Sequence, residues 1–314
     1  MQYYFVRRLA GIVPVWIAIA MVVFAMLRFI PGDPALVLLG GEATPQQLEA
    51  VRVQLGLTKP IPIQFVEWLG HVVRGDLGES LTTHRPVISE IRERLPRSLE
   101  LATLATAISL LVALPSGVLA AVRRNTPWDQ GFLSLGLIGV CIPSFVLALL
   151  LILVFSVKLG WFPLRGYRPM SAGLTTWLSY MTLPALAYGL IDAAQLSRMT
   201  RSTMIDVLGL DFVRTARSKG LTERRVIYRH ALKNALLPIV TIVGLNFGVL
   251  FASTVVIEYI FGLPGIGSLL VDAIRNRDYP VVQGVMLTIA TLYTLLNIAV
   301  DMSYAWLDPR IRYQ

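Results

Sequence analysis

Six stretches of this chain carry no charged residue and are long enough to cross a lipid bilayer. A hydrocarbon core about 30 Å thick needs roughly 20 helical residues at 1.5 Å per residue. Because lipid offers the backbone no hydrogen-bond partners, we expect each stretch to be helical. The pattern therefore predicts an all-α integral membrane protein with six transmembrane helices. The stretches are residues 9–27, 101–122, 130–157, 169–191, 234–257 and 279–300.

Prolines and short connections refine this picture. Pro115, Pro143 and Pro184 lie inside the second, third and fourth predicted spans. Each removes a backbone hydrogen bond, so we expect bends there, which suit a helix that lines a cavity but also occur in passive bundles. The short connection 123–129 predicts a helical hairpin between the second and third spans.

The first apolar stretch could be read as a cleaved secretory signal, because Arg7 and Arg8 precede it. Its apolar run is longer than a typical signal core, however, and Arg28 follows instead of a small-residue cleavage site. We therefore predict a retained transmembrane helix within residues 1–29.

A segment rich in Pro and Gly follows and predicts a separate region, residues 30–98. It contains three amphipathic helix candidates, 45–55, 63–73 and 87–95, the last ending at Pro96. We interpret the region as an extracytoplasmic cap, and the alternative is a surface that receives a delivering protein. Residues 99–306 are then a five-helix core with a cytoplasmic loop at 198–233, and residues 307–314 form a cytoplasmic tail.

Composition and charge agree with a membrane protein and predict its orientation. The 314 residues are 55% hydrophobic and 15% charged, whereas soluble domains are about one quarter charged. With the N-terminus inside, the cytoplasmic segments carry 15 basic and five acidic residues. This bias places both termini in the cytoplasm, and it explains the net charge of +9 without nucleic-acid binding.

Cysteine and histidine offer no chemistry to argue from. The single cysteine, Cys141, lies inside the third predicted span, which excludes an internal disulfide framework. The three histidines, His71, His84 and His230, are far apart and lack ligand spacing. We predict no metal site.

The loop at 198–233 is the strongest functional signal. It places nine Lys and Arg residues against three acids between two apolar spans. Asp211 is expected to cap a short helix, in which Phe212, Val213 and Ala216 form an apolar stripe. Gly220 suits the left-handed turn that ends such a helix.

The following segment completes this predicted arrangement. Thr222 is expected to cap a second helix that carries Val226, Ile227, His230, Ala231 and Asn234 on one side. An apolar stripe rimmed by positive charge can enter a groove with acidic edges on a partner protein. The alternative is a solvated basic loop that obeys the topology rule or touches anionic lipid.

Within this loop, Arg214-Thr-Ala-Arg-Ser-Lys-Gly220 resembles the coupling loop of ABC importer permeases, whose common pattern is Glu-Ala-Ala, three residues, then Gly. Over nearly its full length the chain is similar to the dipeptide, oligopeptide and nickel branch of that superfamily. Further segments that carry the resemblance are Arg7-Arg8-Leu9, Phe29-Ile-Pro-Gly-Asp-Pro34, Arg229-His-Ala-Leu-Lys-Asn-Ala-Leu-Leu-Pro238, Glu258-Tyr-Ile-Phe-Gly-Leu-Pro-Gly-Ile-Gly267, Asp278-Tyr-Pro280 and Gly284.

The chain departs from the general pattern at several positions. Arg214 and Thr215 stand where Glu and Ala are usual, so no glutamate contact to an ATPase is expected at position 214. Lys233 stands where other branches have a proline, which here comes later, at Pro238.

The resemblance implies a type I ABC importer permease fold and a function in ATP-driven solute uptake. Its partners would be a second, similar permease, two cytoplasmic ATPases and an extracytoplasmic binding protein. No phosphate-binding loop of the Gly-x-x-x-x-Gly-Lys-Ser/Thr type is present, so ATP and Mg²⁺ belong to the partner ATPase. Candidate solutes are dipeptides, longer peptides, glutathione, nickel chelates and some oligosaccharides.

The resemblance and the residue types together define three candidate sites. The first is the helix that would contact the ATPase, the second a glycine-rich turn that is either a tight connection or part of an outer gate, and the third an acid that could pair with a peptide amino group. The helix that would contact the ATPase comprises Asp211, Phe212, Arg214, Thr215, Ala216, Arg217, Lys219, Gly220 and Leu221. The glycine-rich turn comprises Gly262, Pro264, Gly265 and Gly267, together with Glu258. The acid is Asp192.

The alternative for Asp192 is a structural role as an interfacial residue that pairs with Arg198 or caps a helix.

Two other functions compete with the importer. An ion-coupled secondary transporter would need paired intramembrane ionisable residues, and the chain shows no clear inverted repeat. A membrane scaffold would keep the basic loop without a solute route.

Overall fold

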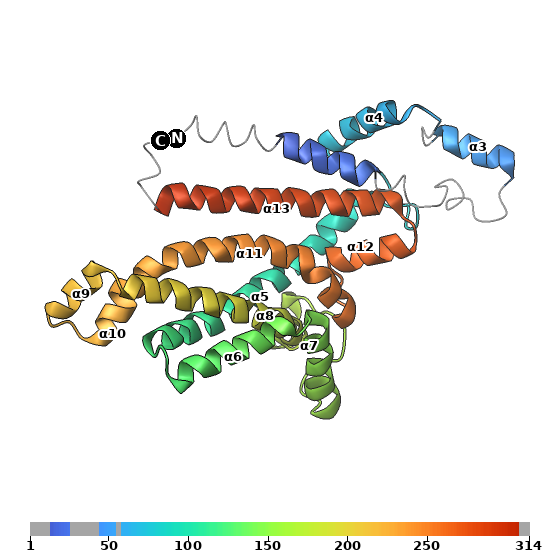
Figure 1. The fold of residues 1–314 in the computed structure, drawn as a ribbon. Coiled ribbons are helices and arrows are strands. Elements are labelled where there is room, and N and C mark those ends of the chain that lie inside the picture. Colours follow the sequence, from blue (N-terminus) through green and yellow to red (C-terminus); the bar gives the residue numbers. More distant parts are fainter. Residues whose placement is uncertain (1–12, 26–43, 55–57, 308–314) are drawn as a thin grey trace. The chain divides into compact units, whose positions relative to one another are not determined.

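The computed structural model describes residues 13–25, 44–54 and 58–307, and over these ranges the chain is helical (Figure 1). The motifs Arg7-Arg8-Leu9 and Phe29 to Pro34, and the basic residues Arg310 and Arg312, lie outside the described residues. Within the described ranges, the one extended pairing is a single antiparallel bridge between Glu79 and Pro86.

The chain divides into two compact units. Unit 1 comprises residues 1–97 and 264–294, and unit 2 comprises 98–263 and 295–314. In unit 1 a helix at Val13–Ala25 is followed by α3 (Pro45–Gln54) and α4 (Ile61–Val73). Helices are therefore present at two of the three predicted positions, 45–55 and 63–73. The unit also holds the start of α5 (Val87–Val122), α12 (Ile266–Arg275) and the start of α13 (Tyr279–Leu307).

Unit 1 has its own small core. Ala20, Val23, Val72 and Leu287 are buried together. Phe24 packs its ring against Phe65, with centroids 5.3 Å apart. This burial of apolar and aromatic surface gives the unit a packed interior independent of unit 2.

A buried carboxylate organises the loop before α5. Asp278 accepts hydrogen bonds from the Ser80 hydroxyl at 2.5 Å and from the backbone N–H groups of Leu81 and Thr82 at 3.1 and 3.2 Å. Several donors to one buried carboxylate offset its loss of water. The Asp278-Tyr-Pro280 segment is thus a structural anchor.

Unit 2 contains the rest of α5 and most of the remaining helices. They are α6 (Pro127–Cys141), α7 (Ser144–Leu151), a π-helical turn η1 (Ile152–Lys158), a 3-10 turn η2 (Met170–Ala172), α8 (Leu174–Leu208), α9 (Asp211–Ser218), α10 (Glu223–Arg225), a π-helical turn η3 (Val226–Ala231) and α11 (Leu232–Phe261). Helices α5 and α6 are joined by the short turn 123–126, as the predicted hairpin requires.

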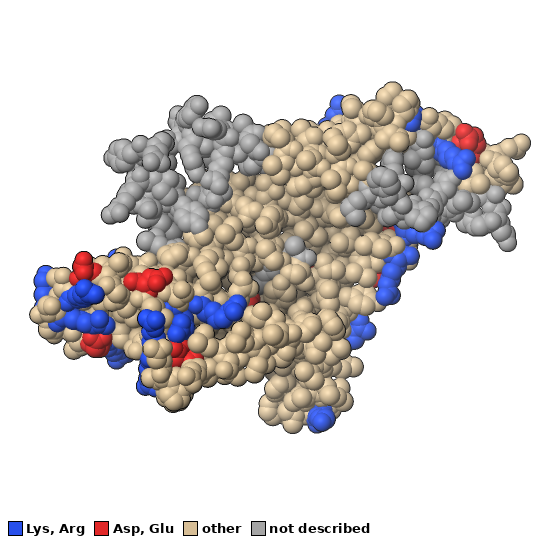
Figure 2. All heavy atoms as spheres, viewed as in Figure 1, with Lys and Arg blue, Asp and Glu red and all other residues tan. Residues whose placement is uncertain are grey.

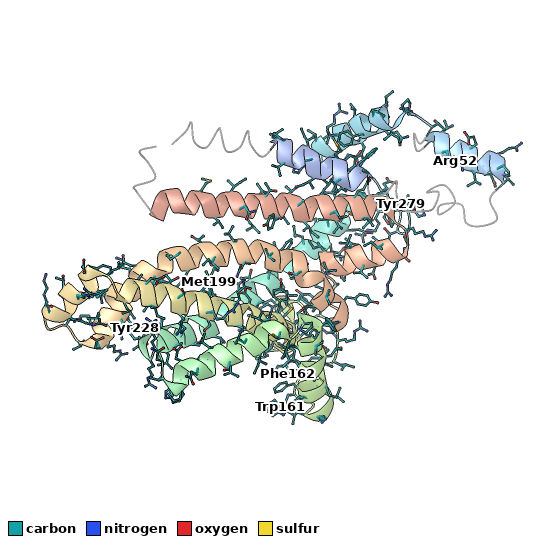
Figure 3. All side chains as sticks on the ribbon, viewed as in Figure 1. Arg52, Trp161, Phe162, Met199, Tyr228 and Tyr279 are labelled. Carbon is teal, nitrogen blue, oxygen red and sulfur yellow. The ribbon has the colours of Figure 1, made fainter. Side chains whose placement is uncertain are left out.

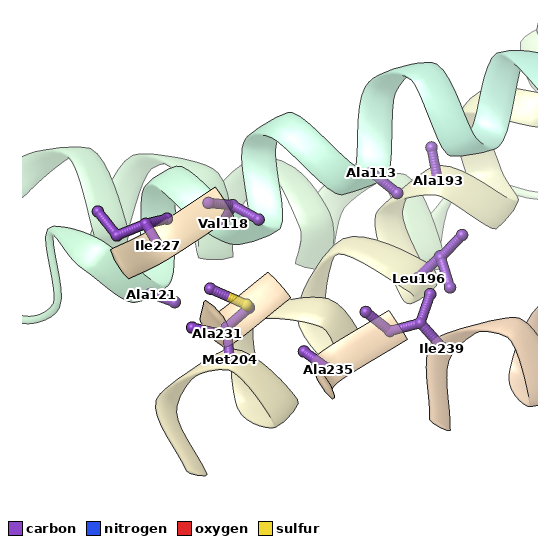
Figure 4. Close-up of a cluster of buried hydrophobic side chains, with 10 residues drawn as sticks. All are labelled: Ala113, Val118, Ala121, Ala193, Leu196, Met204, Ile227, Ala231, Ala235 and Ile239. Carbon is purple, nitrogen blue, oxygen red and sulfur yellow. The ribbon is translucent and has the colours of Figure 1, made fainter. Parts of the chain in front are cut away.

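The core of unit 2 lies where α5, α8 and the start of α11 meet, as the close-up in Figure 4 shows. It is built from small and medium side chains. Small residues let helix backbones approach closely, which drives packing between helices in lipid. The buried set is Ala113, Val118, Ala121, Ala193, Leu196, Met204, Ile227, Ala231, Ala235 and Ile239.

Two helix limits that depended on a proline were predicted wrongly. The segment 87–95 does not end at Pro96, because α5 continues through it to Val122. Pro96 removes a helical hydrogen bond but does not end this helix. Conversely, 130–157 is not one helix: α6 and the α7–η1 segment are bent by 100° at Ile142–Pro143. There Ile142 is extended (φ −84°, ψ 119°), as residues before proline prefer.

Several helices are apolar and long enough to span a membrane. Two described helical segments qualify alone, Val87–Val122 and Tyr279–Val300, and the second matches its predicted span. Counting each of three bent helix pairs as one span raises the number to five. Helix α8 is not among them, because its first half is rich in Thr and Tyr. The predicted first span is described only over Val13–Ala25.

Candidate coupling surface and polar sites

Helix α9 follows α8 after a two-residue break at Gly209 and Leu210. Leu210 occupies the N-cap position in an extended conformation, and no side chain caps the helix. The predicted cap by Asp211 is therefore wrong: Asp211 is the first helical residue, and its carboxylate points to solvent, 3.7 Å from Arg214. Its negative charge still lies at the positive end of the helix dipole.

The apolar residues of α9 divide between two sides. Val213 is fully buried and Ala216 nearly so, both against Val226. Phe212 is 40% exposed. The predicted stripe of three is therefore wrong in its direction, because two of its members attach α9 to the protein. Phe212 alone remains available to a partner.

Gly220 ends α9 as predicted. Its φ is +77°, a conformation that glycine adopts without steric cost. The N–H of Gly220 donates to the Arg217 carbonyl at 2.9 Å, and the N–H of Leu221 to the Ala216 carbonyl at 3.4 Å. Leu221 also packs beside Ala216. These bonds and this contact make up a Schellman motif, which fixes the direction of the chain after α9.

The second helix of the loop begins where expected but is not a regular α-helix. Thr222 occupies the N-cap position without a side-chain hydrogen bond. One α-helical turn, α10, passes into the wider π-helical turn η3 before α11 begins. Of the residues predicted to share one side, Val226, Ile227 and Ala231 are buried, whereas Asn234 is exposed.

The outer side of the loop is basic, with exposed aromatic residues. Lys and Arg side chains gather over α9 and α10 in Figure 2. Arg217 makes a two-point contact with Glu223, its Nε and Nη2 lying 2.8 and 3.3 Å from the carboxylate oxygens. Tyr228, marked in Figure 3, is 59% exposed. Sequence reasoning did not single out Tyr228, which lies off the side that carries Val226, Ile227 and Ala231.

A buried ion pair lies near the α9 end of unit 2. Arg201 of α8 donates Nε and Nη2 to the two oxygens of Asp129, at 2.6 and 2.7 Å. The backbone N–H of Asn125, a residue with φ +62°, donates to the same carboxylate at 2.9 Å. The Arg201 hydrogen bond, opposed by burial, holds the pKa of Asp129 below its ordinary value. Neither residue stood out in the sequence, since a lone acid in a basic turn carries no signal.

Asp192 lies in the middle of α8 and connects three helices. It accepts a hydrogen bond from the Ser109 hydroxyl of α5 at 2.6 Å and from the Asn246 amide of α11 at 3.1 Å. It therefore neither caps a helix nor lies at an end of one. One turn earlier, the Tyr188 hydroxyl bonds to that of Ser253. Within the described residues, Asp192 forms no ion pair with Arg198, the partner considered from the sequence.

Near the other end of the part of α5 that belongs to unit 2, two carboxylates accept hydrogen bonds from neutral donors. Glu258 is 1% exposed and accepts hydrogen bonds from the Ser98 and Thr254 hydroxyls, at 2.6 and 3.1 Å. Glu100 accepts from the Tyr167 hydroxyl at 3.0 Å and from the Trp177 indole at 2.9 Å. The role of Glu100 was not visible in the sequence, because both its donors are more than 60 residues away.

The glycine-rich turn after α11 is a helix end in the structure. Gly262 has φ +64° and ends α11, while Arg165 donates to the Tyr259 carbonyl at 3.0 Å. A cation at the C-terminal carbonyls complements the helix dipole. Gly265 then starts α12, which contains Gly267. The turn thus precedes a short helix that the sequence analysis did not predict.

Metal chemistry finds no support in these sites. Across residues 13–25, 44–54 and 58–307, no group of three or more His, Cys, Asp or Glu side chains could hold a metal ion.

The helical arrangement is that of the permease subunits of type I ABC importers. A structure of the MetNI methionine ABC transporter in an inward-facing conformation matches with a TM-score of 0.58 at 16% identity, over 70% of this chain and 96% of that one. Residues 113–313 match the family described as binding-protein-dependent transport system inner membrane component, and residues 1–102 match its N-terminal model. The chain belongs to this family.

Several relatives match along the whole chain. A putative peptide transport system permease of Brucella abortus (strain 2308) is 45% identical over 98% of both chains. A probable peptide ABC transporter permease of Sinorhizobium fredii is 39% identical, and the glutathione transport system permease GsiC of Pectobacterium atrosepticum 41% identical, each over 100% of both chains. The chain is therefore a multi-pass permease subunit of a binding-protein-dependent ABC importer. Solute delivery and ATP hydrolysis belong to partner proteins.

Proposed function

We propose that this permease carries peptides, including small ones such as glutathione, into the cytoplasm. The observation that carries the proposal is the full-length similarity to permeases described as transporting peptides and glutathione. The test is uptake of a tritiated alanyl dipeptide and of tritiated glutathione by cells that lack or regain the gene for this chain. Unchanged uptake of both probes would contradict the proposal.

The transporter that we propose contains one copy of this chain, a second permease, two cytoplasmic ATPases and an extracytoplasmic binding protein. In it α9 is the coupling helix that contacts an ATPase. The exposed Phe212 and the basic rim of α9 support this role, as does the firm attachment of its other side through Val213. A helix fixed on one side and exposed on the other can transmit a push from a partner.

The proposed contact surface consists of Asp211, Phe212, Arg214, Thr215, Arg217, Lys219, Gly220 and Leu221, with Ala216 supporting it from inside. Cysteines at exposed positions 212, 214, 215 and 219, in a Cys141→Ser background, should crosslink in native membranes to a protein with a phosphate-binding loop. Buried position 216 is the matched control and should label poorly. Good surface labelling at the exposed positions with capture of lipid alone would remove the coupling role.

We propose a topology with six spans and both termini in the cytoplasm. Residues 1–29 hold the first span, 30–98 the external cap, 99–306 the five-helix core and 307–314 a cytoplasmic tail. The basic residues around α9 support this orientation, because short cytoplasmic loops carry the excess of Lys and Arg (Figure 2). Labelling by a membrane-impermeant thiol reagent from outside should reach a cysteine at Arg74 and miss one at Arg224.

We propose that Asp192 contacts the solute and that the turn containing Gly262, Pro264, Gly265 and Gly267, with Glu258, forms an outer gate. A carboxylate within a membrane-spanning bundle is costly unless it has a partner or a function. Asp192→Asn should weaken uptake of a peptide with a free amino group more than uptake of its N-acetylated form. Equal loss for both probes would indicate a structural role through Ser109 and Asn246.

A further inference from the structure

The α5–α6 hairpin is connected to the last turns of α8 by more than apolar packing. The carboxylate of Asp129 accepts two hydrogen bonds from Arg201 and a third from the backbone of Asn125. A guanidinium that meets a carboxylate at two points fixes direction as well as distance. The Asp129 side chain therefore connects the turn after α5 and the start of α6 to the side of α8.

This ion pair differs from those of the α9 loop in its burial. The side chain of Asp129 is 3% exposed and that of Arg201 20%. The pairs Arg214–Asp211 and Arg217–Glu223 are largely exposed, and exposed pairs rearrange at little cost. Removing one partner of a buried pair instead leaves an uncompensated charge, so the Asp129–Arg201 contact resists separation.

Close backbone packing surrounds the pair on both sides. A Cβ atom at Gly117 of α5 would lie 2.6 Å from the Cβ of Thr200, and one at Gly139 of α6 would lie 2.9 Å from the Cβ of Ala194. The hydroxyls of Ser116 and Ser197 are 2.9 Å apart. These small residues let the helix backbones approach closely, which packs the helices tightly at these points. The end of α5 from Gly117 onward, α6, and α8 as far as Arg201 therefore form one block.

The position of this block suggests its use. Helix α8 continues past Arg201 to Leu208, and α9 begins three residues later, at Asp211. At its other end α6 stops at Cys141, followed by the 100° bend at Pro143. Motion of α9 thus has a continuous route through α8 and Asp129 to this bend.

We infer that Asp129 and Arg201 are a positioning pair that makes the α5–α6 hairpin move as one body with the coupling helix, so that ATPase motion reaches the bend at Pro143. The inference rests on the proposed coupling role of α9. It predicts that breaking the pair separates ATP hydrolysis from transport, while the complex still assembles.

The test uses the complete transporter, with its partner permease, ATPases and binding protein, in proteoliposomes. Asp129→Asn removes the charge at nearly constant volume, and Arg201→Lys keeps the charge but loses the two-point geometry. Spin labels at Gln130→Cys and Asp206→Cys, in a Cys141→Ser background, report the distance between α6 and the end of α8. ATP hydrolysis and uptake of a tritiated dipeptide and of tritiated glutathione are measured on the same preparations.

With the pair intact, we expect one narrow distance distribution that is the same without nucleotide and with ATP trapped. Asp129→Asn should broaden it and raise the ATP hydrolysed per solute transported about fivefold or more, the scale of coupling between sites in proteins. Arg201→Lys should lie between wild type and Asp129→Asn. The double variant Asp129→Asn/Arg201→Met should be no worse than either single change, because it leaves no unpaired charge.

Three outcomes would overturn the inference. One is an unchanged distance distribution in Asp129→Asn, and another is a parallel loss of hydrolysis and uptake at wild-type distances. If Asp129→Asn does not assemble, the Arg201→Lys distances decide, and a wild-type distribution there also overturns it. Failure of the coupling role of α9 is recognised separately: crosslinks from α9 would then capture no ATPase, whatever the labels at 130 and 206 report.

Discussion

Unit 2 holds carboxylates in two different ways near the two ends of its part of α5, residues 98–122. Near the α9 end, Asp129 faces the cationic Arg201 and a backbone N–H. At the other end, Glu100 is bound by a phenol and an indole, and Glu258 accepts from two hydroxyls. A buried ion pair specifies one partner in one geometry, whereas neutral donors also serve an uncharged acceptor. The ion pair is therefore expected to resist separation more strongly than the neutral hydrogen bonds of Glu100.

The largest effect should come from leaving the Asp129 charge unpaired. Arg201→Met should destabilise the protein by about 3–5 kcal/mol, because a buried carboxylate loses its counter-ion. Glu100→Gln should cost about 1 kcal/mol, because a glutamine oxygen can still accept from Tyr167 and Trp177. Both losses of stability can be measured by denaturation in detergent micelles, monitored by circular dichroism. Equal costs would remove the distinction between the two ends.

A second prediction tests the packing beside the ion pair. Gly117→Ala places a Cβ atom 2.6 Å from Thr200 and 2.7 Å from the carbonyl oxygen of Ser197. We expect a loss of about 1–3 kcal/mol, because a backbone atom cannot be displaced cheaply. Gly136→Ala is the matched control on α6. Its Cβ would lie at an ordinary 3.5 Å from the Ala194 carbonyl oxygen, so that alanine's better helix propensity should make it neutral or stabilising.

Low pH should destabilise the part of unit 2 near α9 by protonating Asp129. Because its pKa is lowered in the folded protein, the pair contributes its full stability above the unfolded value of about 3.9. That contribution is lost as the pH falls below about 4 and through the folded pKa. The free energy of unfolding changes by at most about 1.4 kcal/mol per pH unit from this group. Melting temperatures between pH 3 and pH 6 should show a step that Asp129→Asn reduces, and an identical step in that variant would contradict the assignment.

Much of the fold was predictable, because apolar runs and glycine turns are local signals. The span 279–300, the helices at 45–55 and 63–73, the hairpin at 123–129 and the left-handed Gly220 follow from adjacent residues. The continuity of α5 through Pro96 did not. Whether a proline ends a helix depends on packing on both of its sides, which sequence periodicity does not report.

The site was predictable in position and less so in orientation. The basic loop was found, yet Val213 and Ala216 turned out to face inward, because they pack on Val226 beyond the Gly220 turn. Asp129 and Glu100 could not be found, since each carboxylate meets donors more than 60 residues away. Contacts of that separation arise from helix packing alone.

The smallest effect should come from the exposed ion pair of the loop. Arg217→Ala removes the contact with Glu223. Both side chains of this pair are largely exposed, so the change should lower the free energy of unfolding by about 0.2–1 kcal/mol. Because the loss is small and further screened by salt, any large fall in uptake would belong to the surface that Arg217 offers a partner. Glu223→Ala breaks the same pair and leaves that positive charge in place. Stability loss equal in both variants, with uptake lost only in Arg217→Ala, is the expected result. Equal losses of uptake would instead assign Arg217 to the loop's own structure and leave Phe212 and Tyr228 as its contacts.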